Sequence, residues 1–166
     1  IIPLINNKIV GGDENGRLNL DDTITRAEFT AMLVRAFKLE GQSDKTYKDV
    51  SGGDWFAPYV GAASAENIIN GYDDGTFGPD KPVTREEMAK ITVSIFKKYK
   101  EIPEADTQKY ADDADISDWA NKYVYEACRA EIMNGTESGS FNPKKEALRC
   151  EAMATVSRLL NKTKGE

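Results

Sequence analysis

The chain has 166 residues, a formal net charge of −6 and no histidine. An acidic charge balance argues against a nucleic-acid-binding protein, and the lack of histidine removes Ser-His and Cys-His nucleophiles, most zinc sites and the usual general base near neutral pH. The chain is 40% apolar, which suffices for a hydrophobic core, but no apolar run approaches the roughly 18 residues of a membrane span. We therefore expect a globular protein that binds no nucleic acid and does not insert into a membrane.

The first predicted element is a glycine-rich loop followed by a helix, within residues 7–37. The apolar residues of this helix recur at helical spacing and form one stripe: Phe29, Met32, Leu33, Ala36 and Phe37. The six residues before the loop lack the charged-then-apolar order of a signal peptide. We therefore expect a fragment of a longer, secreted protein.

The middle of the chain extends this pattern into a complete unit. Residues 47–96 read as an aromatic helix at roughly 55–69, a glycine-rich loop and a second helix with the stripe Met88, Ile91, Ile95 and Phe96. Residue Gly71 follows the first helix, as expected for a left-handed helix cap.

The last third repeats the complete unit 64 positions later. Its first helix is expected at about 119–133 and its second carries the stripe Ala152, Val156, Leu159 and Leu160. The paired landmarks at this offset are Trp55 and Trp119, Tyr59 and Tyr123, Gly71 and Gly135, Gly75 and Gly139, Phe77 and Phe141, and Pro79 and Pro143. The first unit matches only the second half, with one extra residue expected in its loop and Leu20 in place of proline.

Three similar helices with one apolar face each predict a mainly α-helical bundle of helix-loop-helix repeats. We divide the chain into residues 1–40, 41–100 and 101–166, with the first repeat truncated at its N-terminus.

The second helix of each repeat starts on a recurring polar motif. Thr25 with Glu28, and Thr84 with Glu87, fit the capping box, in which the side chains of both residues bind backbone amides. The next residue is an arginine in all three repeats, although a cation is mildly unfavourable at the positive end of a helix dipole. Two interpretations stay open: the arginines and free helix-start amides clamp an anion, or each arginine pairs with a carboxylate of a neighbouring repeat.

The third repeat departs from this motif. Leu148 replaces the capping threonine, which removes a side-chain acceptor worth about 1 kcal/mol, so we expect the groove of Arg149 to be the weakest. Cys150 occupies the small-residue position, and Cys128 lies 22 residues earlier. Without histidine the two cysteines cannot complete a zinc site, so they are either a disulfide or two buried thiols.

The recurring segments, "W..Y", "IINGYDDGTFGPDKPVTREE" and "ITRAEF", resemble the S-layer homology (SLH) family over nearly the whole chain. The resemblance implies a pseudo-threefold, mostly helical body that is not an enzyme and needs no cofactor. Its inter-repeat grooves are expected to bind the secondary polysaccharide of the bacterial cell wall through a pyruvate ketal on N-acetylmannosamine. It further implies an extracellular location at the cell wall or S-layer, as a monomer or as a dimer that exchanges a strand or helix.

The resemblance also implies which residues bind the polysaccharide. Arg26, Arg85 and Arg149 are expected to hold the anion. Thr25, Glu28, Thr84 and Glu87 are expected to shape the helix starts. Gly71, Tyr72 and Gly135 are expected to supply backbone amides and a ring. Trp55 and Trp119 either stack on sugars or lie buried between helices, and the missing tryptophan of the first repeat leaves one groove incomplete.

Three competing functions remain at this point. Asp13, Asn15, Asn19 and Asp22 partly match a calcium loop, but Gly11 stands at the leading ligand position, which favours a simple glycine turn and no metal. The carboxylate pairs Glu86–Glu87 and Asp73–Asp74 could serve a glycosidase only if a cleft separated them. Amphipathic repeats also form protein-protein scaffolds, which is the main alternative to wall binding.

Overall fold

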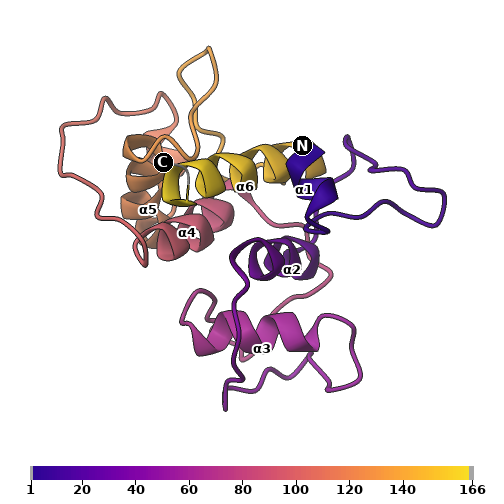
Figure 1. Ribbon diagram of the computed structural model, residues 1–166. Coiled ribbons are helices and arrows are strands. Elements are labelled where there is room, and N and C mark those ends of the chain that lie inside the picture. The colour runs from indigo at the N-terminus through magenta and orange to yellow at the C-terminus, as the bar shows by residue number, and fades with distance from the viewer. Residues whose placement is uncertain (1, 165–166) are drawn as a thin grey trace.

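The computed structural model describes residues 2–164, and this part of the chain is mainly helical (Figure 1). The helices are α1 (Ile2–Asn6), α2 (Arg26–Phe37), α3 (Ala57–Ala65), α4 (Arg85–Phe96), α5 (Asp118–Arg129) and α6 (Arg149–Lys164), with the 3₁₀ helix η1 (Asp113–Asp115) before α5. Within the described range, β-type pairing is confined to isolated bridges, and no helix has both the length and the hydrophobicity that crossing a membrane requires.

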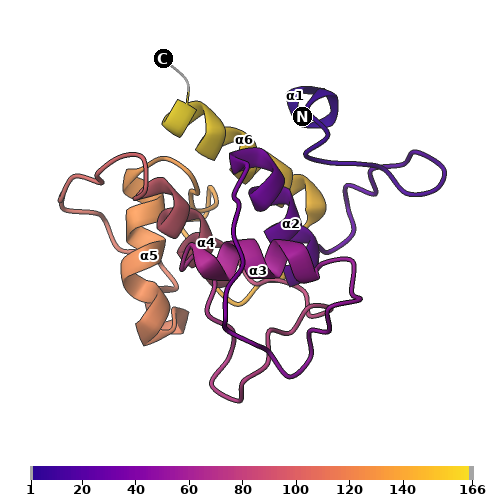
Figure 2. The same cartoon turned by 60° about the horizontal axis from the view of Figure 1, so that its bottom comes forward.

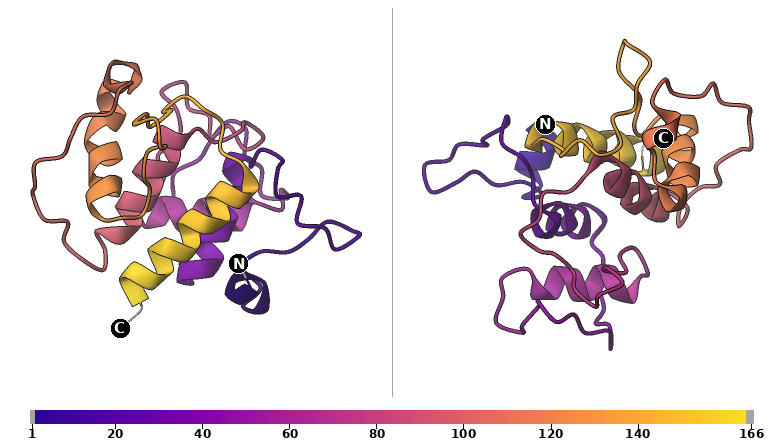
Figure 3. Two further views of the ribbon diagram at one scale, coloured as in Figure 1. Left: turned by 90° about the horizontal axis from the view of Figure 1, so that it is seen from above. Right: turned by 180° about the vertical axis from the view of Figure 1, so that it is seen from behind.

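Helices of neighbouring repeats pack against one another in a regular pattern. The first helix of a repeat packs on the second helix of the preceding repeat: α3 on α2, and α5 on α4 (Figures 1 and 2). Helix α6 contacts both α2 and α4, and α4 lies between α5 and α6 (Figure 3). The repeats therefore form one body with a continuous core.

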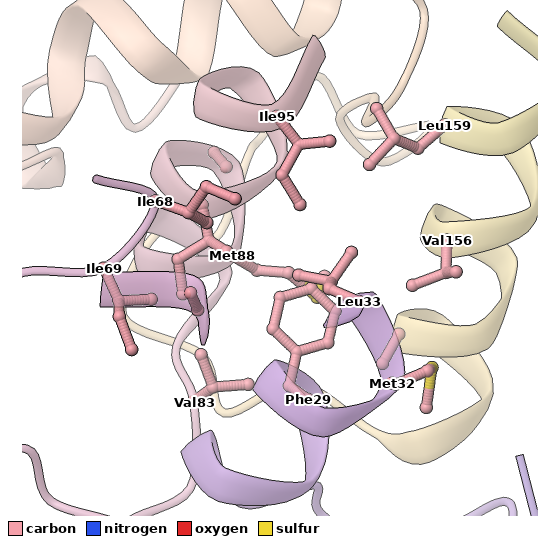
Figure 4. Packing of buried hydrophobic residues seen from close by; sticks show 14 of the residues in the cluster. Phe29, Met32, Leu33, Ile68, Ile69, Val83, Met88, Ile95, Val156 and Leu159 are labelled. Carbon is pink, nitrogen blue, oxygen red and sulfur yellow. The ribbon is translucent and has the colours of Figure 1, made fainter. Parts of the chain in front are cut away.

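The core is built from the three apolar stripes predicted above. Side chains of α2, α4 and α6 point toward one another in Figure 4, and the central ones are at most 1% exposed: Phe29, Leu33, Met88, Ile95, Val156 and Leu159. Burial of such side chains contributes about 1.5–3 kcal/mol each, so this shared core is what holds the repeats together.

A closed ring of backbone hydrogen bonds marks the pseudo-threefold axis. The residue before each capping position donates to its equivalent in another repeat: Ile24 N to Ala147 O at 3.0 Å, Ala147 N to Val83 O at 2.8 Å, and Val83 N to Ile24 O at 3.0 Å. All three side chains are 0% exposed. The expected pseudo-threefold bundle is thus confirmed.

Backbone conformation gives the register of the three loops and corrects one expectation. Residues with left-handed backbone conformation recur 59 and then 64 positions apart. They form three equivalent sets: Lys8/Asn67/Glu131, Gly16/Gly75/Gly139 and Asn19/Gly78/Asn142. The first loop therefore has no extra residue. Left-handed Asn67 and Glu131 follow the capping residues of the first helices, so these helices end earlier than predicted, before Gly71 and Gly135.

Helix α1 corresponds to the last turn of the first helices of the other two repeats. Leu4 O accepts the amide of Ile9 at 2.9 Å, just as Ala63 O accepts the amide of Ile68 at 2.9 Å in the second repeat. Leu4 is 2% exposed, so this single turn is packed into the core as its full-length counterparts are.

The two cysteines do not form a disulfide. Both are free thiols of intermediate exposure. Cys128 takes the place that Ser64 has one repeat earlier, and Cys150 takes the place of Glu86.

Candidate functional site

Three equivalent grooves lie between the repeats, with cavity volumes of about 330, 370 and 400 Å³. Each combines a helix-start arginine of one repeat with the loop and second helix of another. Groove A is lined chiefly by Arg26, Asn70, Gly71, Tyr72, Glu87, Lys90 and Trp119. Groove B is lined chiefly by Arg85, Asn134, Gly135, Cys150, Glu151 and Arg158. Groove C is lined chiefly by Gly12, Glu28, Met32, Arg35, Trp55 and Arg149.

The starts of α2 and α4 hold no free amides, contrary to the anion-clamp interpretation. In α2 the Arg26 amide donates to Lys81 O at 2.9 Å and the Ala27 amide to Pro79 O at 3.0 Å. The Thr25 and Glu28 amides are bound within the capping box, and α4 has the same arrangement. The loop of the next repeat lies against each helix start and takes the donors that an anion would need.

The Arg26 guanidinium is buried and paired. It is 6% exposed as a residue. Its Nε donates to Phe77 O at 3.0 Å and its Nη1 to Glu87 Oε1 at 3.1 Å. The guanidinium carbon lies 4.7 Å from the ring centroid of Tyr72. This arginine therefore joins the first repeat to the second.

The other two arginines repeat this contact around the axis. Arg85 donates Nε to Phe141 O at 2.8 Å, and its Nη1 lies 3.7 Å from Glu151. Arg149 donates Nε to Leu18 O and Nη1 to Glu28, both at 2.9 Å. The inter-repeat ion pairs that the sequence left as an alternative are thus present and form a closed cycle.

Burial shapes the electrostatics of these pairs. It lowers the pKa of Arg85, and the nearby positive charge of Arg158 acts in the same direction while Glu151 opposes it. Burial raises the pKa of Tyr72 to about 12, and its hydroxyl donates to Glu87 at 2.8 Å. The Glu87 carboxylate therefore accepts hydrogen bonds from Arg26 and Tyr72 in groove A in addition to its capping contact.

Both tryptophans lie at groove mouths with much of their surface in solvent. Trp119 is 46% exposed in groove A and Trp55 is 56% exposed in groove C. The alternative that they are buried between helices is therefore wrong. Among the described residues, no tryptophan lines groove B.

Gly71 and Gly135 have a packing role that explains their repetition. A Cβ atom on Gly71 would lie 2.5 Å from a ring carbon of Tyr47 and 2.7 Å from Thr76 O. One on Gly135 would lie 2.5 Å from a ring carbon of Tyr110. Only glycine lets these loops close over the tyrosine rings, and the same glycines then line grooves A and B.

A family model described as "S-layer homology domain" matches residues 1–30, 46–89 and 109–153, which is most of the chain. The chain belongs to the S-layer homology domain family.

Similar SLH segments occur in proteins of different kinds. The amylopullulanase of Thermoanaerobacterium thermosulfurigenes is 36% identical over 96% of this chain, which is 9% of that protein. The surface-layer 125 kDa protein of Lysinibacillus sphaericus is 30% identical over 95% of the chain and 13% of its own length. The cellulosome-anchoring protein of Acetivibrio thermocellus is 28% identical over 91% of the chain and 35% of its own length. The chain thus spans a small part of each relative, and the similarity follows the SLH region rather than a shared catalytic activity.

The SLH grooves bring together most of the predicted site residues. Groove A contains Arg26, Gly71, Tyr72, Glu87 and Trp119. Groove B contains Arg85 and Gly135, and groove C contains Glu28, Trp55 and Arg149. Thr25 and Thr84 line none of the three, because their side chains are turned to the capping boxes.

The expected weakness of the Arg149 groove stays a prediction. Arg149 makes a closer ion pair than Arg85 and lines groove C together with Trp55.

Sequence reasoning missed three cations that line the grooves: Arg35, Lys90 and Arg158. Alignment of the second helices could have drawn attention to them, since they are basic residues on the groove-facing side of otherwise similar helices.

Several candidate residues of the calcium and glycosidase alternatives are engaged in other contacts. The Asp13 carboxylate accepts from the Asn15 and Arg17 amides, each at 2.9 Å, and the Arg17 amide is the main cause of its lowered pKa. No cluster of three potential metal ligands occurs within residues 2–164. Glu86 is 4% exposed and accepts from Ser117, whereas Glu87 lines groove A and pairs with Arg26, so the two carboxylates do not face each other across a cleft.

Proposed function

We propose that the chain is a non-catalytic module that anchors a surface protein to the bacterial cell wall by binding an anionic secondary polysaccharide in its inter-repeat grooves. The module would act outside the cell, at the wall or S-layer. The pyruvate ketal on N-acetylmannosamine, which the family resemblance implies, is the acidic group that we assign to the ligand.

The observation that carries this proposal is the repeated combination of cations and aromatic surface in a groove. Grooves A and C each contain an exposed tryptophan and two basic side chains. An amphipathic ring suits the apolar face of a sugar, and a basic side chain suits a carboxylate on the same polymer.

The relatives support the same assignment. One is a surface-layer protein and another is a cellulosome-anchoring protein, whereas the enzyme relative shares only 9% of its length with this chain. A segment shared by proteins with such different remaining parts suits a common attachment role.

Co-sedimentation with purified cell-wall sacculi tests the proposal. We expect the protein to sediment with intact sacculi and to remain in solution after the wall polysaccharide is stripped with acid. Selective removal of the acidic ketals should weaken binding by about tenfold or more, because charge-assisted contacts would be lost. Undiminished binding to stripped sacculi would contradict polysaccharide recognition and favour the protein-scaffold alternative.

A further inference from the structure

Each groove contains a second basic residue besides the helix-start arginine. It lies on the second helix that also supplies the groove's glutamate: Lys90 on α4 in groove A, Arg158 on α6 in groove B and Arg35 on α2 in groove C.

These cations occupy two alternative positions of the repeat. The position five residues after the helix-start arginine is occupied by Ala31, Lys90 and Ala154, and the position nine residues after it by Arg35, Ser94 and Arg158. Every second helix thus has one cation at one of the two positions. The two positions are four residues apart, about one helical turn or roughly 6 Å along the axis, so the charge of groove A lies closer to the helix start than the charges of grooves B and C.

The second cations form no ion pair within the described part of the chain, although carboxylates also line the grooves. Within residues 2–164, no carboxylate oxygen lies within 4.0 Å of the basic nitrogens of Lys90, Arg35 or Arg158. Each helix-start arginine, in contrast, has a glutamate at 2.9 to 3.7 Å. An anion that approached Arg26 would therefore meet the negative charge of Glu87, whereas an anion at Lys90 would meet an unpaired positive charge.

Two of these cations also lie beside the groove's aromatic surface. Lys90 Nζ is 5.4 Å from the ring centroid of Trp119. The Arg35 guanidinium carbon lies 4.7 Å from the ring centroid of Tyr59, and its Nη2 donates to the Tyr59 hydroxyl at 2.9 Å. The Tyr59 ring in turn lies 6.3 Å from the ring of Trp55. A sugar that contacted either tryptophan would thus hold its acidic substituent within reach of the cation.

We propose that Lys90, Arg35 and Arg158, and not the helix-start arginines, are the residues that contact the acidic substituents of the wall polysaccharide. This inference rests on the proposed function of the grooves. The helix-start arginines hold the repeats together, and the second cations bind the acidic substituents. The acidic group bound in groove A would lie about one helical turn away from the position bound in grooves B and C.

Substitution of the second cations tests this assignment through sacculus binding. Lys90→Met removes the charge but keeps most of the apolar stem. We expect groove A of this variant to bind the wall polysaccharide about tenfold or more weakly. The combined variant Arg35→Ala, Lys90→Met, Arg158→Ala should lose binding to sacculi altogether. Lys90→Arg, which keeps the charge, should bind within about threefold of the unchanged protein.

Lys100→Ala is the matched control, because it removes the same charge from an exposed residue that lines none of the three grooves. Its binding should be unchanged. Thermal unfolding should be unchanged in Lys90→Met and only slightly affected in the combined variant, because Arg35 and Arg158 are exposed and Arg35 loses its hydrogen bonds to Tyr59.

The outcomes separate this inference from the proposed function. If the unchanged protein binds sacculi through their acidic groups and the combined variant still binds equally well, the inference is wrong and the groove function stands. If removal of the acidic groups does not weaken binding of the unchanged protein to sacculi, both the proposed function and the inference are wrong.

Discussion

The ion pair between Arg26 and Glu87 shows what a single residue contributes to this molecule. The two side chains are 7% and 13% exposed and come from different repeats. Removing one partner of a buried pair leaves an uncompensated charge in a site that excludes water. The arginine of the recurring motif is therefore required for the association of repeats, whatever the grooves bind.

We predict that Arg26→Ala lowers the free energy of unfolding by about 3 kcal/mol or more. Arg85→Ala should cost less, because its carboxylate partner is 3.7 Å away and 26% exposed. Urea unfolding followed by circular dichroism measures both values. The Lys100→Ala control should change stability by about 0.5 kcal/mol or less. Equal stability of Arg26→Ala and the unchanged protein would contradict a structural role for this arginine.

Glu151 links one of these pairs to the pH dependence of stability. Partial burial alone would raise its pKa, but the amide of Leu148, the ammonium of Lys145 and the charge of Arg85 bring the pKa below its ordinary value of 4.5. A carboxyl with a lowered pKa in the folded state adds stability above its ordinary pKa and loses that contribution as the pH falls through the folded value.

We therefore predict that the stability difference between the unchanged protein and Glu151→Gln is largest above pH 4.5 and shrinks on acidification below it. Denaturant unfolding at a series of pH values from neutral to acidic gives the two curves. A difference that stays constant over this range would show that the charge of Glu151 contributes nothing to folding.

At the scale of the element, the start of α6 differs from those of α2 and α4. The Glu151 carboxylate still accepts the Leu148 amide at 2.9 Å, which is half of a capping box. The other half needs a hydroxyl at position 148, and no side-chain oxygen among the described residues accepts from the Glu151 amide. Helix α6 thus begins with one of two capping contacts.

We predict that Leu148→Thr completes this box and stabilises the protein relative to Leu148→Ala by about 1 kcal/mol. The alanine variant is the proper reference, because both substitutions remove the same partly buried apolar side chain and only threonine adds the hydroxyl. The denaturation midpoints of the threonine and alanine variants measure this difference. Identical midpoints would mean that the N-terminus of α6 gains nothing from a side-chain acceptor.

Elements also show where local sequence reasoning works. The capping boxes of α2 and α4 form as predicted, and every residue of the predicted α2 stripe is buried. Both features depend on residues three or four positions apart, whose geometry the helix itself fixes. The first helices were predicted too long, because the left-handed residues that end them are Asn67 and Glu131 rather than glycine.

At the scale of the whole molecule, closure of the ring determines how the site is built. The contacts of Arg26 with Glu87 and of Arg149 with Glu28 join residues 61 and 121 positions apart. The third repeat thereby contacts the first, and the first repeat is part of the shared core through Leu4. Each groove consequently contains residues of at least two repeats.

The sequence by itself determined the repeat units, their helical character, the caps of α2 and α4, the apolar faces and the family, because all of these depend on short-range spacing or on motifs recurring in order. Only the tertiary structure decided which carboxylate each arginine meets, that the amides at the starts of α2 and α4 are occupied, that the tryptophans lie at groove mouths, and which groove cations form no ion pair. These properties arise where distant segments pack together, so the energy of each contact depends on positions that no local pattern specifies.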